Sequence, residues 1–199
     1  MIMKKLFALL MLSACSAVFA AETVKLPPPQ KNGGMSLRET LDQRRTVRQF
    51  QDKTLTIQQL ADILWCANGV NRSNGKRTAP SALDKREVMI FAALPHGAYF
   101  YDAEKHLLIK VSGADIRKDC GRYSAPCYLI LVPDKSRQPR DIFAAVDTGY
   151  VSQNIYLAAQ ANQLGTCAMG SIVNREKLVQ ELNLGKNTPL LVHPVGIPR

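Results

Sequence analysis

The sequence predicts an α+β domain in which helices pack on a β-sheet. Three observations indicate this class: capped helices early in the chain, apolar runs of strand length in the middle, and one long apolar helix before the last strand. Hydrophobic residues make up 46% of the 199 residues, which is enough to fill a core without metal or disulfide cross-links. No internal repeat divides the chain, so we expect one compact domain after a leader.

Two capping boxes predict the first helices. Ser36 and Glu39 form an S-x-x-E pattern, and Thr56 begins a second pattern of this type. Each box precedes apolar residues at helical spacing. The first helix should end near Arg44 and the second at Gly69, where glycine stops a helix readily.

The middle and the end of the chain predict strands separated by helices. Apolar runs of strand length are typical of strands that are buried on both faces, and a short polar segment after the second run predicts a hairpin. The predicted strands are residues 87–94, 98–101, 107–111, 127–132 and 190–195. The predicted later helices are residues 141–164 and 174–182.

The long helix over residues 141–164 is the most apolar segment of the predicted domain. Asp141 is its expected N-cap, and Gly165 is the expected residue after its last turn. Apolar side chains point in nearly every direction around its axis. A helix of this kind is buried, either in the core or in a contact between subunits.

The N-terminus predicts export. Residues 1–20 have a basic start, a short apolar stretch and the small-x-small ending Val18-Phe19-Ala20, as in a signal peptide. The alternative is a lipobox that ends in Cys15, which would anchor the protein to a membrane through a lipid. Both interpretations place the protein outside the cytoplasm, in the periplasm of a bacterium. Residues 21–35 are rich in Pro and Gly and predict a linker, so the domain should span residues 36–199.

Charge favours anionic partners. The formal net charge is +10, but the basic residues are scattered, without the tracts or interleaved aromatics that are typical of nucleic-acid binding. We therefore expect no nucleic-acid partner. The net charge alone leaves open a third class of function, a protein that binds an anionic polymer at its surface.

The cysteines and histidines predict no metal site. Four cysteines follow the leader, and we expect them to be small buried residues; a Cys120–Cys127 disulfide is the alternative in an oxidising compartment. Their spacing does not match a zinc site. The three histidines are scattered and predict polar surface or core residues.

The segment RRTVRQF, residues 44–50, carries the first candidate binding residues. Arg44, Arg45 and Arg48 repel one another, so an anion would stabilise the cluster. A guanidinium group is planar and binds phosphate oxygens two at a time, and the Thr46 hydroxyl adds a donor. Taken alone, however, such arginines at a helix end are more often a solvated basic face.

The run LDQRRTVRQF, residues 41–50, resembles the N-terminal signature of the nitroreductase family of FMN flavoproteins. In that family a helix ends in R-R/H-S/T-x-R/K-x-F. The resemblance implies that Arg44, Arg45, Thr46 and Arg48 contact FMN.

A second run, TAPSALDKREVMIF at residues 78–91, is similar to the loop S/A-P-S-A-x-N-x-Q-P-W of the same family. The resemblance implies that Pro80, Ser81 and Ala82 approach the flavin, with Asp84 at the position of the usual Asn. Asn donates a hydrogen bond, whereas ionised Asp only accepts. Either Asp84 faces away, or Lys85 or Arg86 offsets its charge, or the flavin chemistry is altered.

Two later runs complete the resemblance, which covers residues 37–199. LGTCAMGS, residues 164–171, is similar to the turn whose main chain lines one face of the flavin ring, which places Gly170 and Ser171 there. The ending HPVGIPR is similar to the family's last strand and its basic residue at the FMN phosphate, here Arg199. Arg199 also carries the terminal carboxylate, which weakens that role.

The resemblance implies a nitroreductase fold with a central, mostly antiparallel sheet, an FMN cofactor, and a homodimer with the sites at the subunit interface. It implies electron transfer from a reduced donor to a small acceptor such as a nitroaromatic compound or a quinone. The family pattern offers no protein nucleophile or general base, so we assign no catalytic residue. NADH and NADPH are cytoplasmic, so the sequence does not name the donor of an exported member. The alternative is a flavin-binding protein with little turnover, which Asp84 motivates.

Overall fold

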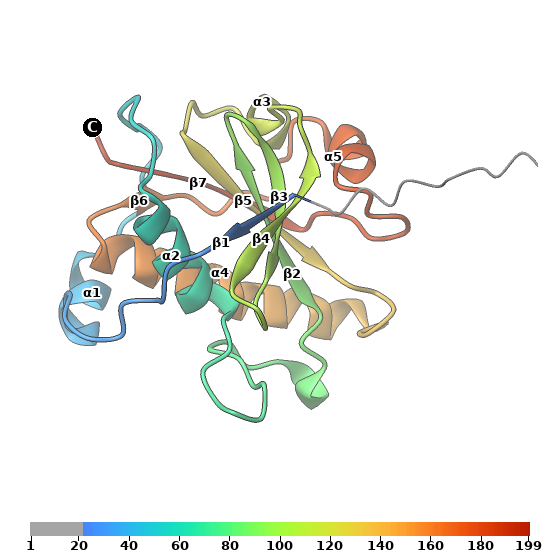
Figure 1. Ribbon diagram of the computed structural model, residues 1–199, viewed down its shortest axis with the longest axis horizontal. Helices are drawn as coiled ribbons and strands as arrows, with labels where there is room; N and C mark the ends of the chain where they lie inside the picture. The colour runs from blue at the N-terminus through green and yellow to red at the C-terminus, as the bar shows by residue number, and fades with distance from the viewer. Residues whose placement is uncertain (1–21) are drawn as a thin grey trace, which may run out of the picture.

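The computed structural model describes residues 22–199, and the predicted leader with Cys15 lies outside this range. Its centre is a seven-stranded sheet with the strand order β1-β4-β3-β2-β5-β7-β6, in which every neighbouring pair is antiparallel (Figure 1). The strands are β1 Thr23–Lys25, β2 Val88–Leu94, β3 Gly97–Asp102, β4 Leu107–Ser112, β5 Cys127–Pro133, β6 Gly165–Thr166 and β7 Leu191–Gly196. The helices are α1 Leu37–Gln43, α2 Ile57–Asn68, α3 Arg117–Cys120, α4 Asp141–Ala161 and α5 Arg175–Glu181, with a 3₁₀ turn, η1, at Ala82–Asp84. This confirms the predicted α+β fold.

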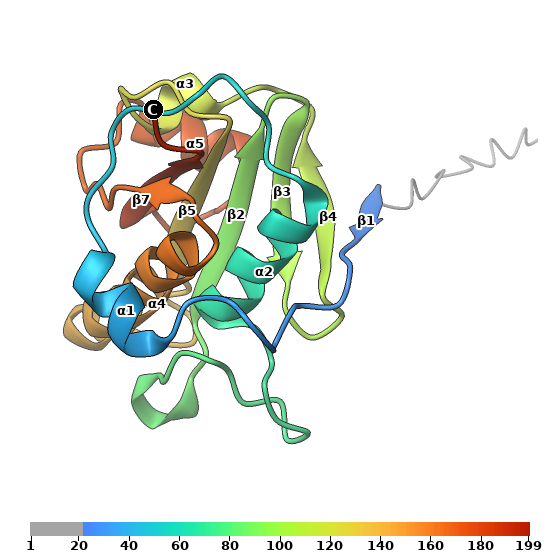
Figure 2. The same ribbon diagram turned by 90° about the vertical axis from the view of Figure 1, so that its left-hand side faces the viewer.

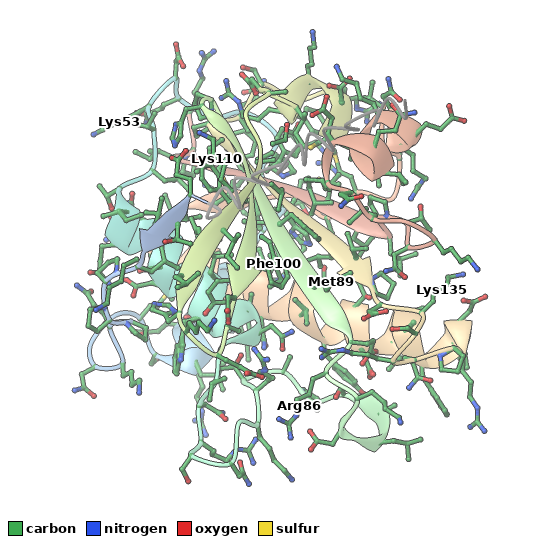
Figure 3. All side chains as sticks on the ribbon, turned by 45° about the vertical axis from the view of Figure 1, so that its right-hand side comes forward. Lys53, Arg86, Met89, Phe100, Lys110 and Lys135 are labelled. Atoms are coloured by element: carbon green, nitrogen blue, oxygen red, sulfur yellow. The ribbon has the colours of Figure 1, made fainter. Side chains whose placement is uncertain are left out.

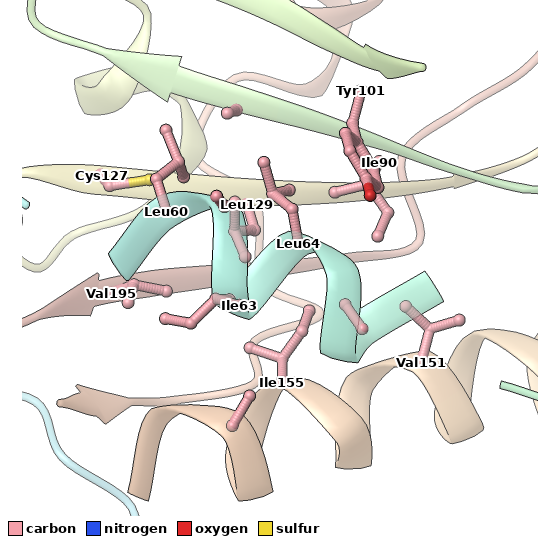
Figure 4. Packing of buried hydrophobic residues seen from close by; sticks show 14 of the residues in the cluster. Leu60, Ile63, Leu64, Ile90, Tyr101, Cys127, Leu129, Val151, Ile155 and Val195 are labelled. Atoms are coloured by element: carbon pink, nitrogen blue, oxygen red, sulfur yellow. The ribbon is translucent and has the colours of Figure 1, made fainter. Parts of the chain in front are cut away.

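Helices α2 and α4 cover one face of the sheet (Figure 2). Leu60 and Leu64 of α2 point toward the sheet, whereas Ile63 points toward Ile155 of α4 (Figure 4). Val151 of α4 belongs to the same buried cluster. Each of these side chains is buried, and burial of an aliphatic side chain contributes roughly 1.5–3 kcal/mol. This core fixes α4 against the sheet, so that residues along α4 can serve as fixed reference points for the loops around it.

The opposite face of the sheet carries a second core. Helix α5 buries Leu178 there, and Cys120 of α3 is buried beside it. Met89 of β2 and Phe100 of β3 lie on this same side, away from α2 and α4, and are only partly buried (Figure 3). The two helices therefore cover only part of this face.

The caps of α1 and α2 are as predicted. In both capping boxes the Ser or Thr side chain accepts from the third helical residue, and that residue's side chain accepts from the cap. Helix α1 ends with Arg44 as its C-cap, and α2 ends with Gly69. Local pairs of residues three positions apart determine where these two helices begin, which is why their starts are predictable from the sequence.

Helix α4 differs from its prediction at both ends. Its N-cap is Arg140 rather than Asp141, and it ends at Ala161, before Gly165. The turn is made by Asn162 as C-cap and by Gln163 in the left-handed conformation, with φ of 56°. Gly165 instead belongs to β6 and pairs with β7. It must be glycine for packing, because a Cβ there would lie 2.6 Å from a side-chain atom of Val47.

Only one side of α4 is buried in the single chain. Val151, Ile155 and other residues of that side face the core, whereas Ile142, Val146 and Tyr150 are 68%, 44% and 47% exposed. These three residues are four positions apart and form one strip, which we call the α4 strip. The expectation that α4 is buried on every side therefore does not hold for the chain by itself.

The linker prediction is wrong for residues 23–25. They form β1, which pairs with β4, and the following Leu26 is only 3% exposed. Three residues are too few to show the alternation that identifies a strand, so the Pro-rich sequence after them dominated the prediction. Residues 26–35 of the predicted linker contain no helix or strand.

The cysteines are unpaired in the described part of the chain. Cys120, Cys127 and Cys167 are buried thiols, as expected, and Cys66 is half-buried. Burial raises the pKa of Cys127 to about 12, which keeps the thiol protonated. The alternative Cys120–Cys127 disulfide is not formed. No helix within residues 22–199 has the length and hydropathy needed to cross a membrane.

Candidate functional site

The arginine segment, residues 44–50, is extended and held from two sides. Helix α1 ends with a hydrogen bond from Arg44 N to Thr40 O (2.9 Å), and the chain then leaves the helix. On one side Val47 N donates to Thr166 O of β6 (2.9 Å). The segment continues past the C-terminus and α3 toward α2 (Figure 2). Extended main chain between fixed strands lets the arginine side chains project away from the core.

The C-terminal residues hold the other side of this segment. Phe50 forms an isolated β-bridge with Pro198, and Arg199 N donates to Gln49 O (3.2 Å). Arg199 is exposed. The fold thus brings the fourth run of the family resemblance beside the first.

Tyr156 of α4 joins the arginine segment to the turn after β6. Its hydroxyl accepts from Ala168 N (2.9 Å) and lies 3.3 Å from the Thr46 hydroxyl. The guanidinium of Arg44 lies over its ring, 5.1 Å from the ring centre, in a cation–π contact. One side chain therefore fixes residues 44–46 against residue 168, although these positions are far apart in sequence.

The arginine cluster has no acidic partner among the residues that the structure describes. Within residues 22–199, no carboxylate oxygen lies within 4.0 Å of the side-chain nitrogens of Arg44, Arg45, Arg48 or Arg199. Arg45 also lines a hollow of about 560 Å³ together with Gln163 and Pro198. Uncompensated like charges repel, and a bound anion would remove that cost. The site is therefore electrostatically prepared for an anion.

The turn at Gly170 and Ser171 lies near a second hollow. Both residues are exposed, and a Cβ at Gly170 would meet no atom within 4 Å. A hollow of about 720 Å³ lies beside this turn, between Val173 and the segment that follows β4. Its walls also include Lys118 and Arg122, whose side chains have no carboxylate within 4.0 Å in the described chain. The volume is in the range of cofactor sites.

The remaining predicted residues, Pro80 to Asp84, lie elsewhere in the chain. Ala82 N donates to Asp147 Oδ2 of α4 (2.7 Å), nine residues before Tyr156. Nine residues correspond to about 14 Å along a helix. The ribbon accordingly shows this loop below α4, away from α1 and β6 (Figure 1). A single chain does not bring the Pro80–Asp84 loop to the arginine segment.

Asp84 has its charge offset by Arg86. Two hydrogen bonds join them, from Arg86 Nε (2.9 Å) and Nη2 (2.7 Å). These bonds lower the pKa of Asp84, so its carboxylate is ionised and already engaged. Of the three expectations for Asp84, the offset by Arg86 is the one that the structure shows. The loop is also strained, because Leu83, Asp84 and Arg86 all have φ between 51° and 56°.

His193 is a neutral core residue behind Tyr156. It is 0% exposed, with Nε2 2.9 Å from the Ser152 hydroxyl and Nδ1 3.1 Å from the Thr166 hydroxyl. Its ring meets that of Tyr156 edge to face at 5.6 Å. Burial lowers the pKa of His193 to about 3. The residue thus fixes α4 to β6 and supports Tyr156, in line with a structural role.

Stability should fall on acidification because of His193. The unfolded chain binds a proton near the ordinary histidine pKa of about 6.5, whereas the folded chain stays neutral down to about 3. Below pH 6.5 the free energy of unfolding should therefore decrease, by at most about 1.4 kcal/mol per pH unit from this group. Urea unfolding of the wild type and of His193→Gln between pH 4 and 7 measures this, and equal slopes for the two proteins would contradict it.

Tyr156→Phe should destabilise the site. The change leaves Ala168 N without its partner and removes the contact with the Thr46 hydroxyl, at a cost of about 1–3 kcal/mol in the free energy of unfolding. Thr54→Val is the control, because it removes an exposed hydroxyl group that lies outside this site and outside the α4 strip. Equal urea midpoints for the two variants would show that the Tyr156 hydroxyl contributes nothing.

Sequence reasoning missed Tyr156, Lys118 and Arg122. Tyr156 lies inside a helix that reads as apolar, and its partners come from two other segments. Lys118 and Arg122 lie in and after α3, a four-residue helix too short to be predicted. The sequence offers no clear signal for them, because Asp115 and Asp119 lie among these cations and only the structure shows which charges pair. Among residues 22–199, no group of three or more histidine, cysteine or acidic side chains is placed to hold a metal ion.

Comparison with known proteins agrees with this geometry. The model of the Nitroreductase family matches residues 41–197. A protein of Methanocaldococcus jannaschii that is named as a nitroreductase is 28% identical over 182 residues, which cover 81% of this chain and 91% of that protein.

Solved structures show the same fold. A crystal structure from Ralstonia eutropha JMP134, also named as a nitroreductase, superposes with a TM-score of 0.84 at 34% identity and covers 89% of this chain and 90% of that one. A structure from Desulfovibrio desulfuricans in complex with FMN superposes with a TM-score of 0.56 at 18% identity. The match covers 81% of this chain and 85% of the Desulfovibrio chain, and it supports the fold alone. The match over residues 41–197 and the similarity at 34% identity establish that the chain belongs to the nitroreductase family.

Proposed function

We propose that this protein is an exported, FMN-dependent oxidoreductase that transfers electrons from a reduced donor to a small acceptor, such as a nitroaromatic compound or a quinone. The observation that carries the proposal is the unpaired arginine segment, which Tyr156 joins to the turn that leads to Gly170. An anion site and an open main-chain turn adjoin each other, which suits a ligand with a phosphate at one end and a flat ring at the other.

The residues present fit FMN. Arg44, Arg45 and Arg48 would bind the phosphate, with the Thr46 hydroxyl as a further donor and Arg199 beside them. The main chain at Gly170 and Ser171 would lie against the ring. Bound FMN would supply the redox chemistry, and the protein would supply its position and electrostatics.

Lys118 and Arg122 have an additional role in this proposal. They line the hollow next to the Gly170 turn and have no acidic partner in the described chain. A positive charge near the pyrimidine edge of a flavin favours its reduced, anionic form. These two residues would thus raise the reduction potential of the cofactor.

We further propose a homodimer that completes each site. The α4 strip is apolar and exposed, as expected of a surface that a second subunit covers. In a two-fold dimer whose α4 helices pair antiparallel, the first half of one helix lies beside the second half of the other. The Pro80–Asp84 loop of one subunit would then approach the arginine segment of its partner.

Export is part of the proposal and rests on the pattern of residues 1–20, with cleavage after Ala20 or lipid attachment at Cys15 as the two routes. The donor would then be a reduced partner outside the cytoplasm. A second candidate function is flavin binding with little turnover. The observation in its favour is Asp84, which holds Arg86 and cannot donate to a flavin as the usual Asn would.

The absorption spectrum of the purified protein after equilibration with FMN and gel filtration tests this proposal. A retained flavin spectrum with about one FMN per chain is the expected result, and bleaching by dithionite followed by reoxidation with a quinone or nitroaromatic acceptor would show turnover. Retained flavin that passes electrons to neither acceptor would favour the second candidate. A colourless protein after equilibration would contradict both and favour binding of another anion.

A further inference from the structure

A buried carboxyl group lies directly behind the Pro80–Asp84 loop. Glu87 is 0% exposed and is the residue directly before β2. Neither of its side-chain oxygens has a hydrogen bond of normal geometry within the described residues. An ionised carboxylate in this position would lack both water and donors, which is strongly unfavourable.

A second buried carboxyl group adjoins the first and holds the loop. Asp147 of α4 is 2% exposed, and its Oδ2 accepts the hydrogen bond from Ala82 N. Glu87 lies next to this carboxyl group. Ala82 is the first residue of η1, so Asp147 fixes the loop from the inside.

The cations nearby do not neutralise two negative charges. Arg137, from the connection between β5 and α4, is the cation that acts on Glu87; its side chain is 57% exposed and pairs with Asp134 at 3.6 Å. Arg86 is turned to Asp84. Asn68 of α2 is neutral, and its side-chain amide donates to Val88 O. Gln138, in the connection between β5 and α4, is buried and also uncharged.

Burial and the adjacent Asp147 carboxyl raise the pKa of Glu87 to about 7, while Arg137 opposes the shift. A proton on Glu87 removes one of the two negative charges and supplies a hydrogen-bond donor between the two carboxyl groups. Two adjacent buried carboxyl groups cannot both ionise without repulsion. The burial of Glu87, its missing donors and the neighbouring carboxyl group therefore all favour a proton on Glu87.

We propose that Glu87 and Asp147 share one proton and that the protonated pair positions the Pro80–Asp84 loop through the Ala82 amide. When the pair loses its proton, the two carboxylates repel, and Asp147 releases the amide. Both are positioning residues. The consequence for the cofactor rests on the proposed function: FMN affinity should fall as the pH rises through neutrality, because this loop would contact the flavin.

Hydrogen exchange at the Ala82 amide tests the pair without any cofactor. Protection, corrected for the intrinsic pH dependence of exchange, should fall at least about tenfold between pH 6 and pH 8.5 in the wild type, as one unit of pKa corresponds to a tenfold change. Glu87→Gln should keep protection at both pH values, because its amide stays neutral and donates to Asp147. Asp147→Ala should lose protection at both. Glu176→Gln and Asp141→Asn, on exposed positions of α5 and α4, should behave as the wild type.

Two further readouts keep the outcomes separate. The ¹³C shift of the Glu87 carboxyl in the wild-type protein reports its ionisation directly, whatever the stability of the variants. FMN affinity should weaken about tenfold from pH 6 to 8.5 in the wild type and stay constant in Glu87→Gln. A Glu87 carboxyl that is ionised at pH 5.5, or Ala82 protection that is equal at both pH values in the wild type, would overturn the proposal. Absence of FMN binding at every pH would instead contradict the proposed function and leave the exchange test valid.

Discussion

Replacing Arg48 by alanine should weaken FMN binding by about 1.5–3 kcal/mol, or roughly 10- to 150-fold in Kd, the size of a hydrogen bond to a charged group. Arg48 is exposed on the extended segment beyond α1 and has no acidic partner in the described chain, so the variant loses no ion pair of the free protein. The loss should therefore appear in binding and not in folding. Quenching of FMN fluorescence on titration with protein measures it.

Arg38→Ala is the matched control for this change. Arg38 lies on α1, is also exposed, and belongs to none of the runs that resemble the FMN contacts of the family. Its Kd for FMN should equal that of the wild type, and the urea midpoints of all three proteins should agree. An unchanged Kd for Arg48→Ala would remove the role that we assign to this residue.

If the protein forms the proposed dimer, aspartate at both Ile142 and Val146 should convert it into monomers and abolish FMN binding at micromolar concentrations. In a dimer paired along α4 the two carboxylates of each chain would be buried without partners, at a cost of several kcal/mol each. Both residues are exposed in the single chain, at 68% and 44%, so the fold of each subunit should survive. The FMN site should be lost with the dimer, because the Pro80–Asp84 loop would come from the partner.

Sedimentation equilibrium together with FMN titration measures both effects. Ile57→Asp is the control, since Ile57 is an apolar residue of comparable exposure on α2 and not on the α4 strip. This control should remain a dimer with full FMN affinity. A wild type that is monomeric and still binds FMN, or a double variant that stays dimeric, would contradict the proposed assembly.

A mixing experiment tests whether each site uses two chains. Arg48→Ala impairs one half of the site, and Ala82→Trp should block the other half by adding bulk to the loop. If the halves come from different subunits, mixed dimers regain one intact site, so FMN binding should reappear on mixing two impaired proteins. No recovery after demonstrated subunit exchange would place both halves in one chain.

The sequence predicted the parts of the fold that local pairs of residues determine. The capping boxes at Ser36 and Thr56 gave the helices α1 and α2, and apolar runs gave the strands of the central sheet. The sequence predicts Gly165 at the end of a helix, because a glycine after an apolar helix is usually such a stop. Its real constraint is the side chain of Val47, which no local pattern shows.

Long-range contacts explain what the sequence could not predict about the candidate site. The runs that begin at Arg44 and end at Ser171 are about 120 residues apart in the chain, and Tyr156 joins them through contacts with Thr46 and Ala168. The loop at Asp84 was grouped with them by resemblance, whereas its hydrogen bond to Asp147 places it toward the other end of α4. Burial of Glu87 likewise depends on the packing of α4 against β2 and leaves no mark on the local sequence.

The comparison of FMN with riboflavin tests the central claim most directly, because the two flavins differ only in the phosphate. If the arginine segment binds that phosphate, FMN should bind at least about 100-fold more tightly than riboflavin, since two charge-assisted contacts are worth about 3 kcal/mol or more. Arg48→Ala should reduce that ratio by about tenfold or more and leave riboflavin affinity unchanged. Riboflavin that binds within about threefold of FMN, a difference of under 1 kcal/mol, would contradict the account.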